Sequence, residues 1–462
     1  MPLLDSADSR PVHFVGIAGA GMSALAELFV RRGIAVTGCD ANPTGADDLR
    51  RLGITVTPHS PTHVSGARAL VVTSAMPKDH PELQRARECG VPVIRRAEAL
   101  GEVTRGHELI AIAGTHGKTT TTVMTTEALG AAGRNPTALV GGRVASWSGN
   151  LRLGGDRLYV VEADEYDRSF LALTPTVAVV TNIEADHLDI YGDIAEIRAA
   201  FAQFLSPART VVLCGEDPGI AVMRLPSGSE VIRYAIGGGP GERDARLVAR
   251  DVRQEGSGMV YEAEYDGEPL GTVGLNVPGR HNILNSLGAL GSGLALGAPA
   301  PELMRGLGGF RGVERRFERL GDARGVTILD DYAHHPTEIL ATLAAARGAF
   351  PRHRLLVAFQ PHLFSRTRDF AREFAASLAT ADALYLTEIY PSRESPIPGI
   401  TSSLIVEHLG DADANLAWRG DRRDLARALA ADVRSGDVVV FMGAGDITES
   451  GPELLSLLQE SK

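Results

Sequence analysis

Short apolar runs recur along the 462-residue chain, and each ends in a turn that carries glycine, aspartate or histidine. A helix-like stretch follows most of these turns. Regular alternation of strand and helix is typical of parallel α/β sheets, in which ligands bind at the carboxyl ends of the strands. The residues that directly follow each apolar run are therefore the first candidates for a functional site.

The apolar runs fall into three segments, residues 1–106, 107–312 and 313–462, without repeats or long linkers. Between residues 230 and 277 the pattern changes to a glycine-punctuated alternation that is typical of antiparallel hairpins. We predict three α/β domains: an N-terminal Rossmann-like domain, a central P-loop ATPase-like domain whose mostly parallel sheet carries added antiparallel hairpins, and a C-terminal Rossmann-like domain. The runs assigned to strands are 12–17, 35–38, 69–73, 109–113, 158–161, 177–181, 326–329, 354–359, 383–387 and 438–442.

Composition and charge argue against several kinds of binding partner for this protein. The chain is 44% hydrophobic and 22% charged, as in ordinary globular proteins, and its net charge of −11 without a basic block argues against nucleic acid. No stretch approaches the roughly 18 apolar residues of a membrane span, and residues 1–10 lack a secretory signal. The three cysteines include no CxxC pair, so their spacing indicates neither a disulfide framework nor a zinc knuckle. We expect a cytoplasmic protein with no membrane partner, either a monomer or a weak homodimer.

A phosphate loop is the clearest motif. Residues 114–122 read Gly-Thr-His-Gly-Lys-Thr-Thr-Thr-Thr, directly after an apolar strand and before a helix. Gly114 and Gly117 allow backbone amides to turn toward phosphate oxygens, Lys118 supplies a positive charge, and the Thr119 hydroxyl can bind Mg²⁺. The first glycine of the standard motif would fall at Ile112, so a simple helix-capping turn is the alternative. Lys118 is one of only three lysines in the chain, which favours the phosphate loop.

Two further residues fit a magnesium site at the same edge of the predicted sheet. Glu162 ends the run 158–161, and His187 follows the run 177–181. Carboxylate oxygens are preferred Mg²⁺ ligands, and ATP chemistry needs that ion. The alternatives are a solvated loop carboxylate and a helix-capping or core histidine. Together with the phosphate loop, these residues predict ATP and Mg²⁺ as cofactors.

The first segment carries a second nucleotide signal. The pattern Gly19-x-Gly21-x-x-Ala24, with Asp40 about twenty residues later, fits a dinucleotide fingerprint in which the aspartate accepts from ribose hydroxyls. Alone, this turn would predict an NAD-dependent oxidoreductase. Two different nucleotide sites in one chain instead favour an ATP-dependent enzyme that acts on a nucleotide-linked substrate.

Over essentially its whole length the chain resembles the Mur ligases, and among them the alanine-adding member most closely. The residues that carry this resemblance are Gly16–Ser23, the phosphate loop, Glu162–Glu165, Asn182–Asp189, Gly279–Asn285, Arg315–Glu318, Asp330–Pro336, Phe359–His362 and Met442–Ile447.

The resemblance implies a three-domain enzyme that joins L-alanine to the lactyl carboxylate of UDP-N-acetylmuramate and forms ADP and phosphate during peptidoglycan synthesis. Residues 1–106 would bind the UDP-sugar, residues 107–312 would bind ATP, and residues 313–462 would close over ATP and bind the amino acid.

Particular residues acquire roles through the same resemblance. For ATP these are Gly114, Thr115, His116, Gly117, Lys118, Thr119, Thr120, His281, Asn285 (adenine), Arg316 (phosphates) and Asp331 (ribose), with Thr119, Glu162 and His187 around Mg²⁺. For the UDP-sugar they are Gly19, Ala20, Gly21, Met22, Asp40 and Ser74, and for the amino acid and carboxylate they are Tyr332, His334, His362 and Arg366.

The implied chemistry activates the carboxylate as an acyl phosphate, which the amine then attacks. Phosphoryl transfer depends mainly on charge neutralisation and positioning, which suits Lys118, Arg316 and Mg²⁺. We therefore expect Lys118, His187, Arg316, His334 and His362 to act in catalysis, with either of the last two as acceptor of the amine proton. Because acyl phosphates hydrolyse, we also expect the third domain to close and exclude water.

The chain departs from the family pattern at two points, and other interpretations stay open. Leu363 stands where alanine-adding members often have arginine, and the absence of lysine between residues 118 and 462 excludes the carbamylated lysine of some relatives. A ligase that attaches a whole tripeptide, a nicotinamide oxidoreductase and a nucleotide-binding regulatory module are the rival functions. Asp330, Asp331, His334 and His335 could also form a dedicated metal site.

Overall fold

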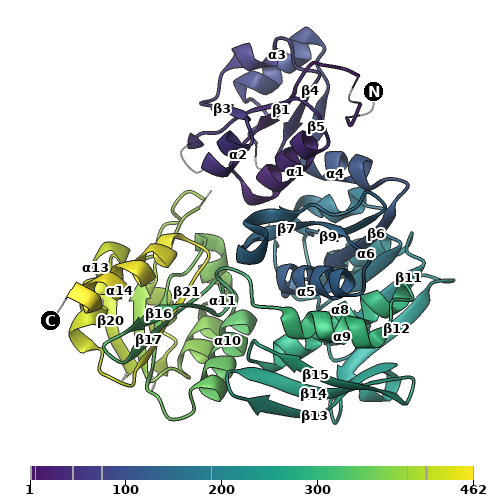
Figure 1. Cartoon of the computed structure of the whole chain (residues 1–462). Helices are drawn as coiled ribbons and strands as arrows, with labels where there is room; N and C mark the ends of the chain where they lie inside the picture. Colours follow the sequence, from purple (N-terminus) through teal and green to yellow (C-terminus); the bar gives the residue numbers. More distant parts are fainter. Residues whose placement is uncertain are drawn as a thin grey trace. The chain divides into compact units, whose positions relative to one another are not determined.

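The protein is described by a computed structural model that covers residues 3–5, 7–43, 46–73, 76–188, 190–392, 394–410 and 415–460. The described residues form three β-sheets with helices packed around them (Figure 1). The chain divides into two compact units. One contains Met1–Val252, Tyr261–Gly274 and Ile283–Phe310, and the other contains Arg253–Val260, Leu275–Asn282 and Arg311–Lys462.

The N-terminal sheet has five strands in the order β3-β2-β1-β4-β5, and all of its pairs are parallel. This order is that of a doubly wound nucleotide-binding sheet, so the predicted Rossmann-like domain is confirmed. The core strand β1 is entirely buried, as its apolar sequence predicts. The elements are β1 (Val12–Val15), α1 (Ala20–Arg31), β2 (Val36–Cys39), α2 (Asp47–Arg51), β3 (Thr55–Thr57), η2 (Pro61–Val64), β4 (Ala69–Val72), α3 (Pro81–Cys89), β5 (Val93–Arg95) and α4 (Arg96–Thr104).

The central sheet has ten strands in the order β15-β14-β13-β12-β11-β10-β6-β9-β7-β8. Its middle strands are parallel and fully buried, which explains their unbroken apolar sequences. The elements are β6 (Glu108–Ala113), α5 (Lys118–Ala131), β7 (Thr137–Val144), η3 (Ala145–Trp147), β8 (Gly149–Arg152), β9 (Leu158–Glu162), η4 (Tyr166–Ala172), β10 (Val177–Val180), α6 (Ile194–Leu205), β11 (Thr210–Cys214), α7 (Pro218–Ala221), β12 (Glu230–Ile236), η5 (Glu242–Asp244), β13 (Leu247–Glu255), β14 (Gly258–Tyr265), β15 (Glu268–Leu275), α8 (Arg280–Ala295) and α9 (Ala300–Gly309).

The hairpin prediction for residues 230–277 is correct for only part of that segment. Two-residue turns join β13 to β14 and β14 to β15, and neighbouring strands joined so tightly must be antiparallel. Asp266 and Gly267 in the second turn both have positive φ, as such a hairpin requires. β12, in contrast, is parallel to both β11 and β13. The longer connection after β12 permits this arrangement, and the strand extends the parallel part of the sheet.

The C-terminal sheet has six strands in the order β16-β17-β21-β18-β19-β20, with only the pair β16–β17 antiparallel. From β20 to β21 the order matches the Rossmann pattern, and β17 then adds to the outside of β21. The elements are β16 (Glu318–Ala323), β17 (Val326–Asp331), α10 (Pro336–Ala349), β18 (Leu355–Phe359), α11 (Phe364–Leu378), β19 (Ala383–Thr387), α12 (Ser403–Val406), β20 (Leu416–Gly420), α13 (Arg422–Asp432), β21 (Val438–Met442), η7 (Asp446–Glu449) and α14 (Ser450–Glu460).

Strand register places the predicted functional residues at shared sheet edges. In the central sheet Ile112 is level with Glu162, and Ala113 is level with Val180. In the C-terminal sheet Asp331 and Phe359 are both level with Met442. The three domain segments predicted from the sequence each contain one sheet, while the exact boundaries after residues 106 and 312 stay predictions. Among the described residues, no helix combines the length and apolar character needed to cross a membrane.

Candidate active site

The phosphate loop joins β6 to α5, and its backbone depends on two glycines. Gly114 and Gly117 have φ angles of 137° and 80°, which residues with a side chain rarely adopt. A Cβ on Gly117 would lie only 2.5 Å from Oδ1 of Asn285. The helix begins at Lys118 without a side-chain cap, so the amides of its first turn can bind an anion.

Residues after β10 hold the outer side of this loop. The hydroxyl of Thr181 and the side-chain amide of Asn182 both donate to the carbonyl oxygen of His116, at 2.6 and 3.0 Å. In return, the backbone amide of His116 donates to Oδ1 of Asn182 at 2.8 Å. Oγ1 of Thr115 accepts from the backbone amide of Glu184 at 2.9 Å. These hydrogen bonds fix the loop at the carboxyl edge of the sheet.

Two other residues predicted to bind the nucleotide lie in the first turn of α5 or beside that helix. Thr120 is buried in the first turn of α5. Asn285, on α8, accepts a hydrogen bond of 3.2 Å from the Thr121 hydroxyl and is itself buried. This placement brings Asn285 to the phosphate-loop helix, and its contact with adenine stays a prediction.

Lys118 extends across its own loop. Its ammonium group donates to the carbonyl oxygens of Gly114 at 2.6 Å and Thr115 at 3.2 Å, and to Oε1 of Glu165 at 2.9 Å. Burial opposes the charge on the lysine, but Glu165 and the neighbouring acidic residues outweigh it and raise the pKa of the ammonium group. The lysine is therefore held positively charged where phosphate oxygens would bind.

Glu165 is a site residue that the sequence analysis did not single out. Its side chain is almost fully buried beside Lys118, and its backbone oxygen accepts a 2.6 Å hydrogen bond from the Tyr191 hydroxyl. Burial raises the pKa of Glu165 to about 7, although Lys118 opposes the shift. Its position three residues after Glu162 in an acidic motif was the only sequence signal, and that signal did not reveal its burial.

Thr119 and Glu162 are brought together as the magnesium prediction requires. The Thr119 hydroxyl lies 3.0 and 2.9 Å from the two carboxylate oxygens of Glu162. The backbone amide of Gly141 donates to the same carboxylate at 2.7 Å, which fixes its orientation. A hydroxyl and a carboxylate held together are the hard oxygen donors that Mg²⁺ prefers, so these residues fit that ion.

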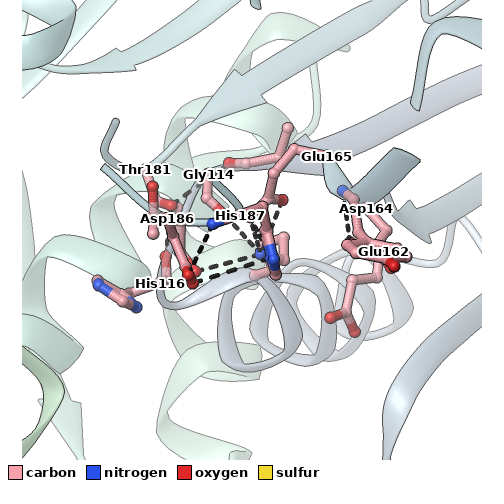
Figure 2. A network of polar contacts seen from close by, with 12 residues as sticks. Gly114, His116, Glu162, Asp164, Glu165, Thr181, Asp186 and His187 are labelled. Carbon is pink, nitrogen blue, oxygen red and sulfur yellow. Dashed lines mark hydrogen bonds and ion pairs between the residues drawn. The ribbon is translucent and has the colours of Figure 1, made fainter. Parts of the chain in front are cut away.

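His187 lies beside Glu165 and Asp186. Its Nε2 is 3.9 Å from Oε1 of Glu165 and 3.8 Å from Oδ2 of Asp186, and its ring packs edge-on against Tyr166. Figure 2 shows His187 and Glu165 at the centre of this polar network, with Glu162 and Asp164 at its side. The histidine thus belongs to the surroundings of Lys118, and its role as a magnesium ligand stays a prediction.

In the N-terminal domain α1 begins at Ala20, within the glycine turn. Asp40 supports the turn, since its two carboxylate oxygens accept from the amides of Ala18 at 2.9 Å and Asn42 at 3.0 Å. Gly19 caps the helix without a side-chain bond, which leaves amides of the first turn for a diphosphate. Met22 is buried in the core, and Ser74 lies outside the described residues.

Arg96 at the start of α4 is a second residue that the sequence analysis missed. A Cβ on Gly21 would lie 2.9 Å from the guanidinium group of Arg96, so this cation packs directly against the glycine turn. A cavity of about 270 Å³ lies beside the same turn. Its lining includes Ala18 and Ala20 from the turn and Arg143 and Asn150 from the β7–β8 hairpin.

Four residues predicted for the amino-acid side do gather in the C-terminal domain. The ring of His334 lies 5.3 Å from that of Tyr332 and 5.9 Å from that of His362. Arg366 is buried, with its guanidinium 3.5 Å from Nδ1 of His362. Leu363, which replaces the family's frequent arginine, is buried and adopts a φ of 71° at the start of α11.

The two histidines have different hydrogen-bond environments. Nδ1 of His334 lies 3.0 Å from the carbonyl oxygen of Tyr332 and 3.1 Å from Oε2 of Glu338. Both neighbours are acceptors, so Nδ1 must carry the proton and Nε2 is then the basic nitrogen. Nδ1 of His362 instead lies 3.5 Å from the guanidinium of Arg366, which can only donate, so an accepting Nδ1 fits this pair. The geometry thus favours a basic Nε2 on His334 and an Nε2–H on His362.

The residues predicted to contact ATP from the C-terminal domain, and His281 at the start of α8, lie near each other. Asp331 accepts backbone hydrogen bonds from Phe317 at 2.7 Å and Ala333 at 2.8 Å. Burial raises the pKa of Asp331 to about 6, although Arg316 opposes the shift. The guanidinium of Arg316 stacks over the ring of Tyr332. Burial, with a smaller contribution from Arg316, lowers the pKa of His281 to about 4.

The alternative metal site in the same segment does not assemble. Asp330 accepts a 2.7 Å hydrogen bond from the Thr448 hydroxyl, whereas Asp331 binds backbone amides. His334 is bonded to Glu338, and His335 caps α10. The four side chains are each committed to a different partner, which argues against a shared ion.

A phosphate loop at the carboxyl edge of a parallel sheet, with a Rossmann-like domain on either side in the sequence, defines a P-loop nucleotide-binding enzyme of three domains. Three family models match the chain: the Mur ligase family catalytic domain at residues 11–108, the Mur ligase middle domain at 112–293 and the Mur ligase glutamate ligase domain at 315–445. The chain belongs to the Mur ligase family.

Individual relatives match nearly the whole chain. A UDP-N-acetylmuramate–L-alanine ligase of Mycobacterium sp. (strain JLS) is 43% identical over 99% of this chain and 96% of its own length. The crystal structure of a UDP-N-acetylmuramate-alanine ligase from Thermotoga maritima has a TM-score of 0.83 at 30% identity, covering 98% of this chain and all of that one. A murein peptide ligase from Psychrobacter arcticus has a TM-score of 0.72 at 24% identity, covering 98% and 99% of the two chains, which shows the shared fold.

Proposed function

We propose that this chain is an ATP-dependent ligase that joins L-alanine to the lactyl carboxylate of UDP-N-acetylmuramate in peptidoglycan synthesis. The observation that carries the proposal is the charged, part-buried Lys118 across a phosphate loop, in a chain that matches alanine-adding relatives over almost its full length. ATP would supply the phosphoryl group, and ADP and phosphate would be released.

Phosphoryl transfer is the first step. The carboxylate attacks the γ-phosphorus of ATP, the bond to the β-phosphate oxygen breaks, and an acyl phosphate forms. Lys118 and the amides at the start of α5 neutralise charge on the transferred group. Thr119 and Glu162 would hold Mg²⁺, which supplies further neutralisation of the phosphate oxygens when bound. Arg316, Asn285, His281 and Asp331 would contact the remaining parts of ATP.

The second step is amide formation. The amine of L-alanine attacks the acyl carbon, phosphate leaves, and the amine must lose a proton. We assign that proton to Nε2 of His334, because Glu338 and the carbonyl oxygen of Tyr332 hold its other nitrogen protonated. His362 and Arg366 would position the carboxylate groups through donated hydrogen bonds.

The nucleotide sugar would bind at the glycine turn of the N-terminal domain. The free amides at the start of α1 and the guanidinium of Arg96 suit a diphosphate. Asp40, which directly follows β2, and Ser74 would contact the nucleoside. We place the protein in the cytoplasm, where its nucleotide substrates are made.

The test is phosphate release from ATP and Mg²⁺ in the presence of UDP-N-acetylmuramate, with L-alanine, with a tripeptide or with no acceptor. We expect release that requires both the nucleotide sugar and L-alanine. Release with the tripeptide alone would reassign the chain to the recycling activity. Absence of release under all three conditions would refute the proposed ligase.

A further inference from the structure

A second cluster of polar side chains lies inside the N-terminal domain, away from the phosphate loop in sequence. His13 on β1, Cys39 on β2, His63 on η2 and Glu82 on α3 converge there from four separate elements. His13, Cys39 and Glu82 are at most 1% exposed. Burial of a carboxylate and two imidazoles in one place is costly unless each group has a partner.

The inner atoms of this cluster lie close together. Nε2 of His13 is 3.7 Å and Nδ1 of His63 is 3.4 Å from carboxylate oxygens of Glu82. Sγ of Cys39 is 3.2 and 3.1 Å from the two oxygens of the same carboxylate. In a tetrahedral site with zinc–ligand distances of about 2.0–2.3 Å, neighbouring ligand atoms lie roughly 3.3–3.8 Å apart. The distances to Glu82 are close to those of a zinc site, and the four ligand atoms all lie within 4.8 Å of one another.

The two histidines are oriented by their outer nitrogens. Nδ1 of His13 is hydrogen-bonded to the Thr37 hydroxyl at 2.8 Å, and Nε2 of His63 to the Thr57 hydroxyl at 3.1 Å. The opposite nitrogens point inward, are buried, and have no hydrogen-bond partner in the described part of the chain. An imidazole whose outer nitrogen is fixed and whose inner nitrogen lacks a hydrogen-bond partner is the arrangement found around protein-bound metals.

We propose that His13, Cys39, His63 and Glu82 form a closed binding site for one Zn²⁺ ion. Two imidazole nitrogens, a sulfur and a carboxylate oxygen are the donors that zinc accepts, and four protein ligands indicate a structural rather than catalytic ion. Sequence spacing could not reveal the site, because its ligands come from four elements across about 70 residues and include a single cysteine.

Metal binding requires a proton to leave. Burial, and then the neighbouring Glu82, raise the pKa of the Cys39 thiol, which donates to that carboxylate in the absence of metal. Zn²⁺ binding converts the thiol to a zinc-bound thiolate and releases one proton to solvent, with no change in oxidation state. His59 is partly exposed, and its Nδ1 lies 3.1 Å from Sγ of Cys39.

The site lies directly behind the glycine turn. The carbonyl oxygen of Cys39 accepts from the amides of Gly16 and Ile17, at 2.8 and 3.1 Å. The next residue, Asp40, binds the amide of Ala18. A zinc ion on Cys39 would therefore stabilise the segment that shapes the turn and would link β1, β2, η2 and α3.

The test uses the full chain, stripped with a chelator and then titrated with Zn²⁺ alone. We expect about one tightly bound zinc ion per chain by elemental analysis and a rise in Tm of roughly 5 °C or more. Replacing Zn²⁺ by Co²⁺ should give a thiolate-to-cobalt charge-transfer band. Cys39→Ser should remove that band and weaken zinc binding at least about 100-fold.

Two matched variants locate the ion. Cys89→Ser changes an exposed cysteine of the same domain and should keep both the band and the affinity. Glu162→Gln alters the predicted magnesium site and should also keep them. Stoichiometry well below one ion, or a wild-type cobalt spectrum without a thiolate band, would overturn the proposal. Circular dichroism will show whether the Cys39→Ser variant is folded. If it is not, the presence or absence of the thiolate-to-cobalt band in the wild type still supports or overturns the proposal.

Discussion

Lys118 and the buried Glu165 form an ion pair at the base of the phosphate loop, with their nearest side-chain atoms 2.9 Å apart. The same ammonium group also binds the carbonyl oxygen of Gly114 at 2.6 Å. These contacts hold the charged lysine in place beside the amides that begin α5, and this arrangement is preorganised for an anion.

The first prediction concerns this charge. Lys118→Met keeps most of the side-chain volume and removes the cation, so phosphate release with all substrates should fall by at least about 100-fold. Lys78→Met changes an exposed lysine outside the loop and should leave the rate as in the wild type. Equal rates for Lys118→Met and the wild type would show that the loop does not act on ATP.

The second prediction concerns the magnesium ligands. Glu162→Gln loses the charged oxygen beside the Thr119 hydroxyl, so the Mg²⁺ concentration for half-maximal activity should rise by about tenfold or more. The measurement is phosphate release as a function of Mg²⁺ at saturating ATP. Glu196→Gln, on the exposed side of α6, serves as the control and should not shift the Mg²⁺ curve. An unchanged curve for Glu162→Gln would remove this carboxylate from the metal site.

The parts of the fold that the sequence predicted are those specified by local pattern. Strand β10 (Val177–Val180) is apolar throughout because every residue is buried, and Gly114, Gly117 and Lys118 are close together in the chain. Patterns of this kind depend on few neighbours. They therefore indicated the three sheets and the phosphate loop without tertiary information.

The features that the sequence analysis missed are of two kinds. Some are strands with a weak hydrophobic pattern, and others depend on contacts between residues that are distant in sequence. Strands β16 and β20 are edge strands with mixed polar sequences and half-exposed residues, so they lack an apolar run. The burial of Glu165 and the packing of Arg96 against Gly21 arise only when separate elements meet. The proposal of His334 rather than His362 as acceptor of the amine proton likewise depends on tertiary contacts. Glu338 lies beside His334, and Arg366 lies beside His362.

The third prediction follows from the lowered pKa of His281. Its folded-state pKa is about 4, against about 6.5 when unfolded, so the fold favours the neutral ring. The stability it contributes is complete above about pH 6.5 and is lost as pH falls toward 4, by up to about 3 kcal/mol. The His281→Gln variant cannot bind this proton. As the pH is lowered, the free energy of unfolding of the unit that contains Arg311–Lys462 should therefore fall less steeply in the variant than in the wild type.

Urea unfolding between about pH 7 and pH 4.5 measures this difference. Trp418 reports on the C-terminal sheet when Trp147 is replaced by phenylalanine. His353→Gln is the control, since it removes an exposed histidine and should keep the wild-type slope. Parallel pH dependences for His281→Gln and the wild type would contradict the prediction.

The fourth prediction separates the two histidines of the amino-acid side. His334→Asn keeps a donor toward Glu338 but has no basic nitrogen, so kcat at neutral pH should fall by about 100-fold or more and the acid limb of its pH profile should disappear. His362→Asn should mainly raise KM for L-alanine and keep the acid limb, because its Nδ1 faces Arg366. The reverse pattern would move the base to His362.

The fifth prediction concerns the backbone of the phosphate loop. Gly117→Ala places a Cβ 2.5 Å from Oδ1 of Asn285 at a φ of 80°, so it combines backbone strain with a clash inside the nucleotide site. Gly133→Ala is matched in φ, at 74°, but its Cβ would meet no atom within 4 Å. Both variants should lose about 1 kcal/mol from positive φ, and Gly117→Ala should lose more from the clash. Only Gly117→Ala should also raise KM for ATP, by tenfold or more. If Gly133→Ala raised it equally, general destabilisation rather than loop geometry would explain the effect.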